Sequence, residues 1–205
     1  MSITLGKIRT ILASQTALRL LFFALGITGV LATVALQPAR AGRSAPAGIP
    51  ANLRVPPGNA LFHIGHATGT QNYICLSTGW AAYGPQAVLF DKVNEQSLTH
   101  FLSPNPAEAN TPRPTWQDSR DSSLVWAAPV PGASFTPDPT AVPWLLLQVV
   151  GTAEGPTGGS RMAQTTYIQR IYTTGGLTPA GACTEGEKAL VPYTADYLFY
   201  KAKGK

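Results

Sequence analysis

The sequence is organised around HIGHATGTQNYIC, the stretch from His63 to Cys75. It contains two of the three histidines and one of the two cysteines of the chain. The pattern predicts a strand, a turn at Gly65 and Gly69, and a second strand. Cys183 lies far downstream, just before the last predicted strand. A bond between Cys75 and Cys183 would therefore join this stretch to the C-terminal part of the chain.

Residues 1–41 have the features of a signal peptide. A basic region is followed by an apolar run from Leu20 to Leu36, and Ala39-Arg40-Ala41 supplies the small residues that a signal peptidase recognises. An uncleaved membrane anchor is the alternative, because the run is only slightly shorter than the roughly 20 residues of a spanning helix. We expect an exported protein, either secreted or periplasmic.

The charge of the mature chain is close to zero. The full chain has 15 basic and 10 acidic residues, and four of the basic ones (Lys7, Arg9, Arg19 and Arg40) lie in the signal segment, which leaves 11 against 10. Without a run of basic residues to neutralise phosphates, nucleic acid is not an expected partner. A membrane is not an expected partner either once the signal is cleaved.

Two cysteines in an exported chain most simply form one disulfide bond, here between Cys75 and Cys183. Two buried free thiols are the alternative. A metal pair is not expected, because the chain has no Cys-x-x-Cys spacing.

The mature chain reads as an extended lead-in at 42–59 and a single all-β domain at 60–205. Short runs with a period of two, bounded by Gly, Pro, Asn and Asp, predict about eight strands in a β-sandwich or a barrel-like fold with long Pro/Gly-rich loops. The strands are expected at 60–66, 70–76, 87–91, 97–102, 123–127, 144–150, 165–174 and 193–200. The run from Trp144 to Val150 is apolar on both faces, so we expect a central strand that is covered on both sides.

Two long proline-rich connections separate the predicted strands. Residues 103–122 contain Trp116, Asp118 and Asp121 and are interpreted as a functional loop, because loops of this length in compact domains are usually functional or disordered. Residues 129–143 are interpreted as a flap that covers the sheet.

His100, at the end of a predicted strand, directly precedes the first of these loops. A histidine with Asp118 and Asp121 is sufficient for general acid–base chemistry or for a metal. The alternative is a hydrogen bond from His100 to an aspartate that fixes the loop. His63 and His66 are not expected to share a metal, because residues i and i+3 of a strand face opposite sides.

Trp116 and Trp80 lie in loop-like contexts and are candidates for stacking on a sugar ring, with core packing as the alternative. Arg170 and Asp196 are single charges within strong strands and are expected to pair across the sheet. No complete nucleotide-binding, nucleophile-elbow or zinc-protease motif is present, and no cofactor is expected.

The order of the motifs resembles a family of exported bacterial and fungal proteins that is known only as a domain of unknown function, with some fungal members associated with appressoria. The resemblance rests on GTQNYIC (69–75), PQAVLF (85–90), THF (99–101), PWLLL (143–147), IQR (168–170), TTGG (173–176) and VPYTADYLFY (191–200), with Trp116 and Cys183 between them. It covers nearly all of residues 59–201, and it supports the fold and export but implies no activity, substrate or cofactor. The chain departs from the family pattern at Arg113-Pro114-Thr115-Trp116, at Asp121-Ser122-Ser123, and in a longer insert after His100.

We therefore expect a non-catalytic exported domain that binds a cell-envelope or extracellular ligand, such as a glycan or a small molecule. The alternatives are an enzyme, metal-assisted or general acid–base, that uses His100 with Asp118 or Asp121, and a structural envelope protein. The candidate ligand-binding residues are His100, Trp116, Asp118, Asp121 and Trp80.

Overall fold

The computed structural model describes residues 46–204. The predicted signal peptide lies outside the described residues. Within residues 46–204, no helix is both long and apolar enough to cross a membrane.

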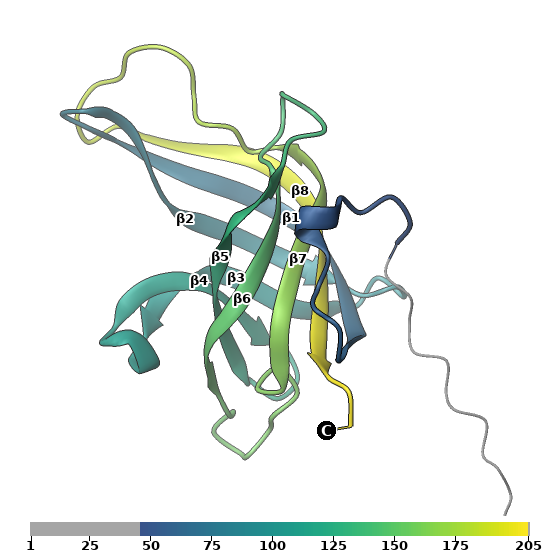
Figure 1. Cartoon of the computed structure of the whole chain (residues 1–205). Helices are drawn as coiled ribbons and strands as arrows, with labels where there is room; N and C mark the ends of the chain where they lie inside the picture. The colour runs from purple at the N-terminus through teal and green to yellow at the C-terminus, as the bar shows by residue number, and fades with distance from the viewer. Residues whose placement is uncertain (1–45, 205) are drawn as a thin grey trace, which may run out of the picture. The chain divides into compact units, whose positions relative to one another are not determined.

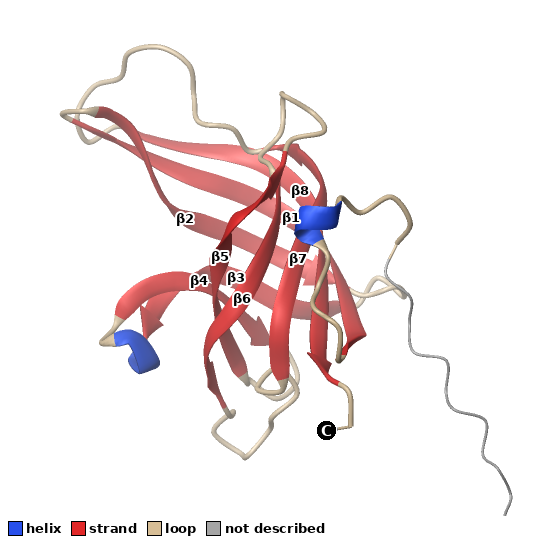
Figure 2. Ribbon diagram, in the orientation of Figure 1, coloured by secondary structure: helices blue, strands red, loops and turns tan. Residues whose placement is uncertain are grey.

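The domain is a closed antiparallel barrel in which each strand pairs with its neighbour in sequence and β1 pairs with β8 (Figure 1). The strands are β1 (Asn59–Leu76), β2 (Gly79–Phe90), β3 (Gln96–Asn105), β4 (Thr111–Asp118), β5 (Leu124–Phe135), β6 (Trp144–Ala153), β7 (Thr165–Gly175) and β8 (Lys188–Ala202). Two short 3-10 helices, η1 (Ala51–Leu53) and η2 (Pro106–Glu108), are the helical elements of the described residues (Figure 2). The prediction of an all-β, barrel-like fold with about eight strands is confirmed.

The two strands predicted on either side of Gly65 and Gly69 form one continuous strand, β1. The predicted turn is wrong, and the two glycines instead allow β1 and β2 to approach closely. A Cβ atom at Gly65 would lie 2.8 Å from Leu89 Cδ2, and one at Gly69 would overlap the carbonyl oxygen of Gln86. The absence of a side chain is therefore a packing requirement at both positions.

The prediction of a long loop at 103–122 is also wrong. Most of these residues belong to a hairpin of β3 and β4, with η2 at its tip. β4 pairs with β5 only from Thr115 to Gln117, so Pro112 and Pro114 lie where β4 has no partner on that side. Prolines are tolerated on such an edge because no ladder hydrogen bond is required there. The proline content therefore suggested a loop where the chain forms an edge strand.

The predicted flap at 129–143 is likewise shorter than expected. β5 continues through Pro129 to Phe135, with an irregularity in its pairing with β6 between Pro129 and Ser134. Only residues 136–143 connect the two strands.

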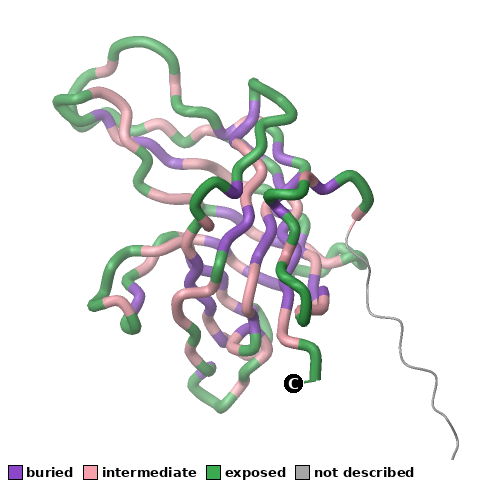
Figure 3. The backbone as a smooth tube through the Cα atoms, in the orientation of Figure 1, coloured by how far each residue is buried: buried purple, intermediate pink, exposed green. Residues whose placement is uncertain are grey.

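One apolar cluster lies inside the barrel and a second covers part of the outer face of its wall, and along the strands buried residues are interspersed with partly buried and exposed ones (Figure 3). The inner cluster includes Leu89, Leu98, Trp116, Ile168, Tyr197 and Phe199. The outer cluster joins Ile49 and Leu53 of the N-terminal segment to Leu146, Ile171, Leu198 and Tyr200. β6 contributes Leu147 to the inner cluster and Leu146 to the outer one, which confirms that this strand is covered on both faces.

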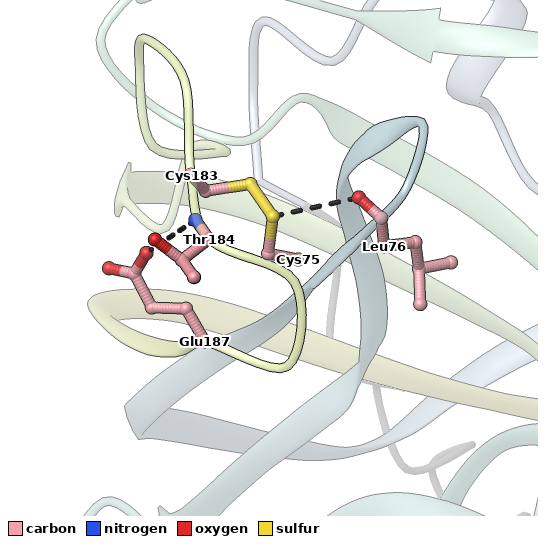
Figure 4. Close-up of a disulfide and its surroundings, with 5 residues drawn as sticks. All are labelled: Cys75, Leu76, Cys183, Thr184 and Glu187. Atoms are coloured by element: carbon pink, nitrogen blue, oxygen red, sulfur yellow. Dashed lines mark hydrogen bonds between the residues drawn. A yellow bond between two sulfur atoms is a disulfide. The ribbon is translucent and has the colours of Figure 1, made fainter.

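The up-and-down order of the strands places alternate turns at opposite ends of the barrel. We call the end with the β2–β3, β4–β5 and β6–β7 turns the Arg161 end, and the other the disulfide end. Cys75 at the end of β1 is bonded to Cys183 in the β7–β8 loop, with 5.9 Å between the Cα atoms, so the predicted disulfide is confirmed (Figure 4). Backbone hydrogen bonds from Cys75 N to Glu187 O and from Gly186 N to Cys75 O hold the same loop.

Candidate ligand-binding cavity

A cavity of about 90 Å³, partly open to solvent, lies inside the barrel on the disulfide side of the inner cluster. Every strand contributes to its lining, which is why it lies within the barrel rather than on its surface. The lining residues are Gln71, Pro85, His100, Pro114, Trp116, Pro129, Leu145, Leu147, Arg170 and Tyr197. Three prolines and two leucines make most of this wall apolar.

Three aromatic rings that pack against one another form the inner part of the cavity. His100 lies parallel to Trp116 with 4.1 Å between the ring centroids, and Tyr197 meets both rings edge-on, at 5.1 Å and 5.4 Å. The exposed fractions of Trp116 and Tyr197 are 1% each, and that of His100 is 3%. These buried rings fill the space beside the cavity, which is small.

His100 is neutral in this environment. Burial lowers the pKa of its imidazole to about 3, and the nearby charge of Arg170 acts in the same direction, against the hydrogen bond to Thr115. Nδ1 donates to the carbonyl oxygen of Thr115 at 2.8 Å, so Nδ1 carries the proton and Nε2 is an acceptor.

Arg170 brings a positive charge to the cavity. Its Nε and one terminal nitrogen donate to the carbonyl oxygen of Pro143, at 3.1 Å and 2.9 Å. No carboxylate of residues 46–204 forms an ion pair with this guanidinium. The predicted pair of Arg170 with Asp196 is therefore wrong, because Arg170 faces the interior while Asp196 bonds to His66 on the outer face.

Two further donors at the cavity have no acceptor. Gln71 Nε2 and Trp116 Nε1 are buried, and neither makes a hydrogen bond to any described residue. The amide of Gln71 approaches the Tyr193 hydroxyl without reaching hydrogen-bonding geometry. Burial raises the pKa of Tyr193, so its hydroxyl is neutral and supplies no negative charge to the cavity. A buried donor without a partner costs about 1–3 kcal/mol, so an occupant with acceptor atoms would stabilise the site.

The structure separates the sequence-predicted site residues into three places. His100 and Trp116 meet at the cavity, although Trp116 lies within β4 and not in a loop. Trp80 lies on β2 opposite Cys75, at the disulfide end. Asp118 and Asp121 lie at the Arg161 end, and no contact joins either of them to His100.

Asp118 and Asp121 instead close the Arg161 end of the barrel. The Asp118 carboxylate is fully buried and pairs with Arg161 at 2.8 Å, and Arg161 also contacts Nδ1 of His63 at 3.0 Å. Asp121 accepts hydrogen bonds from Ser123 and from the backbone N–H of Arg161. Both oxygens of each carboxylate accept hydrogen bonds at this end of the barrel, so the structure does not bring either aspartate beside His100.

Among residues 46–204, no three His, Cys, Asp or Glu side chains lie close enough together to hold a metal ion. One histidine of the described residues, His66, pairs with a carboxylate: its Nδ1 lies 2.6 Å from Oδ1 of Asp196.

Sequence reasoning missed Arg170 and Gln71 as cavity residues. The signal for Arg170 was present, because the alternation of β7 places it on the same face as the buried Ile168. A charged residue on the apolar face of a strand requires a specific partner or function. Gln71 gave no comparable signal, because the sequence does not show which face of its predicted strand turns inward.

Fold and cavity together define a class: small antiparallel β-barrels that enclose a cavity at one end. Comparison with protein families then identifies the particular group. Residues 56–201 match the model of the family described as "Protein of unknown function (DUF3455)", and the chain belongs to this family. Comparisons with curated proteins and with solved structures find no match.

Proposed function

We propose that this protein is a non-catalytic binding protein whose barrel cavity takes the carboxylate group of a small molecule. The observation that carries the proposal is the set of donor side chains that line one cavity, two of which have no acceptor. Gln71 and Trp116 have unpartnered N–H groups, and Arg170 has a charge without a carboxylate. A carboxylate accepts several hydrogen bonds and neutralises a guanidinium, so it matches all three groups.

The volume of the cavity limits what enters it. A volume of about 90 Å³ corresponds to roughly three water molecules, which is also about the size of a carboxylate group. Three atoms at a ceiling of about 1.5 kcal/mol each contribute at most about 4.5 kcal/mol, a dissociation constant near 1 mM. Tighter binding requires that the rest of the ligand lies outside, against the apolar rim. Pro85, Pro114 and Pro129 form this rim, so we infer an apolar ligand body.

Export agrees with this proposal. The signal-peptide pattern of residues 1–41 and the disulfide between Cys75 and Cys183 both support an oxidising compartment outside the cytoplasm. The ligand would then be an extracellular or cell-envelope molecule with a terminal carboxylate.

Calorimetric titration with straight-chain monocarboxylates, from acetate to decanoate, tests the proposal. Affinity should rise with chain length, because each added methylene covers more of the apolar rim. Decanol, which lacks the charge, should bind at least about tenfold more weakly than decanoate. Arg170→Met should reduce the affinity for decanoate by a similar factor.

Arg120→Met is the matched control, because Arg120 lies on the surface at the opposite end and pairs with Glu95. This variant should bind decanoate like the wild type. Absence of saturable binding across the whole series, or equal binding by the Arg170→Met protein, would overturn the proposal that the cavity takes a carboxylate.

A further inference from the structure

A second hollow, of about 460 Å³, lies on the outer face of the barrel. Its base is formed by β1 and β8, where His66 pairs in register with Asp196 and Thr68 with Thr194. The β2–β3 turn, with Asp91, Lys92 and Asn94, lines the hollow, and so does Tyr172 of β7. Its volume lies within the range of roughly 300–1,000 Å³ that is common for small-molecule sites. The lining is separate from that of the barrel cavity.

The polar groups of this hollow are varied and carry charges of both signs. His66 Nδ1 lies 2.6 Å from Asp196 Oδ1, and no described residue makes a hydrogen bond to the second carboxylate oxygen of Asp196. Asp91 accepts hydrogen bonds from the backbone N–H groups of Val93 and Glu95, which fixes the turn. Lys92, Asn94 and two threonine hydroxyls add donors, so the lining offers both donors and acceptors to a neutral ligand.

Tyr172 gives the hollow an exposed aromatic ring. Its backbone φ is 50°, in the left-handed region, at a point where the pairing of β7 with β8 is irregular. This conformation is strained for a bulky residue and would be adopted more easily by glycine or asparagine. Nevertheless 47% of Tyr172 is exposed, so burial of its ring does not explain its presence. Trp144 supports the ring in an edge-to-face contact at 5.1 Å.

From this arrangement we infer that the hollow is a saccharide-binding groove. The apolar C–H face of a sugar ring packs on Tyr172, and the sugar hydroxyls hydrogen-bond to Asp196, His66 and the residues of the β2–β3 turn. An exposed aromatic ring beside carboxylate, amide and hydroxyl groups is the combination that a neutral polyhydroxylated molecule requires. The strain at Tyr172 is then a cost in stability that places the ring beside the ligand.

Calorimetric titration of the full exported protein with chitohexaose, cellohexaose, laminarihexaose and maltohexaose tests this inference. We expect saturable binding of at least one of these oligosaccharides by the wild type. Tyr172→Phe keeps the ring and should retain binding. Tyr172→Gly removes the ring and should weaken binding at least about tenfold. Asp196→Asn should weaken it too, because the amide replaces one acceptor oxygen with a donor.

Melting curves separate a binding role from a structural one. Tyr172→Gly should melt close to or above the wild type, because glycine adopts φ 50° without strain. Tyr83→Ala is the matched control, since Tyr83 is also exposed but lies on β2 away from the groove, and it should bind like the wild type. Arg170→Met should also leave saccharide binding unchanged, which keeps this result separate from that of the barrel cavity. Inert behaviour toward all four oligosaccharides, or undiminished binding by Tyr172→Gly, would overturn the inference.

Discussion

At the scale of single residues, the barrel interior places polar groups among aromatic rings. His100 and Trp116 stack in the inner cluster, and each has a consequence that can be measured. His100 should make the stability of the folded protein depend on pH. Trp116 should contribute a large packing energy. Arg170 and Gln71 differ from them, because their polar groups face the cavity.

His100 should make the folded protein less stable in mild acid. Its pKa is about 3 in the folded state and about 6.5 in an unfolded chain, so between these values the unfolded chain binds more protons. Stability therefore falls as the pH falls below about 6.5, by about 2 kcal/mol between pH 7 and pH 5. Urea unfolding at both pH values should show this loss for the wild type and a clearly smaller one for His100→Gln. Equal losses would mean that His100 is not the group responsible.

Trp116 should behave as a core residue. Truncation of a buried tryptophan typically costs about 3–5 kcal/mol, and Trp116 is 1% exposed. Trp116→Ala should lose stability of this size in urea unfolding, while Trp80→Ala, at a partly exposed position on β2, should lose much less. A Trp116→Ala protein as stable as the wild type would place this ring outside the core.

At the scale of the elements, β1 is the strand on which the barrel closes, because it pairs with both β2 and β8. Its glycines determine how closely β2 can approach. Gly65 faces a side chain of β2, whereas Gly69 faces its backbone.

Gly69→Ala should therefore be more destabilising than Gly65→Ala. The new methyl group at position 65 meets the Leu89 side chain, which can adjust at a cost of about 1–3 kcal/mol. At position 69 it overlaps the Gln86 carbonyl and the Ala87 backbone, so the strands must separate. Thermal unfolding of the two variants would show the order, and a Gly69→Ala protein as stable as Gly65→Ala would contradict the close approach.

The elements also show how far the sequence could predict this fold. Period-two alternation located most strands, and the apolar run of β6 correctly indicated a strand covered on both faces. β4 was missed because prolines on an edge strand carry the same composition as a loop. The turn predicted within β1 failed because glycine is required both in turns and where strands pack closely.

The candidate site was less predictable than the fold. His100 and Trp116 were identified, but their position in the interior depends on barrel closure, which no local pattern specifies. Asp118 and Asp121 attracted attention as carboxylates near His100 in sequence. Their shared partner Arg161 comes from the β6–β7 connection, about 40 residues downstream, and sequence spacing does not relate it to them.

At the scale of the whole molecule, the disulfide joins the end of β1 to the β7–β8 loop. Cys75 and Cys183 are separated by 108 residues, so the bond restricts a large part of the unfolded chain. The chain-entropy model gives about 4–5 kcal/mol for a loop of this size. The double variant Cys75→Ala/Cys183→Ala should therefore unfold at a lower urea concentration than the wild type. An unchanged midpoint would show that the bond adds nothing to stability.

The barrel as a whole positions donors from different strands around one small cavity, and its central prediction is that a carboxylate occupies it. The most direct test is the indole N–H resonance of Trp116 in ¹⁵N-correlated NMR spectra, assigned with Trp116→Phe. Decanoate should shift this resonance downfield as it saturates the site, because Nε1 gains an acceptor, and in Arg170→Met the midpoint of this titration should lie at about tenfold higher decanoate. An unmoved Trp116 resonance while decanoate binds, or the same titration midpoint in Arg170→Met as in the wild type, would contradict carboxylate binding in the cavity.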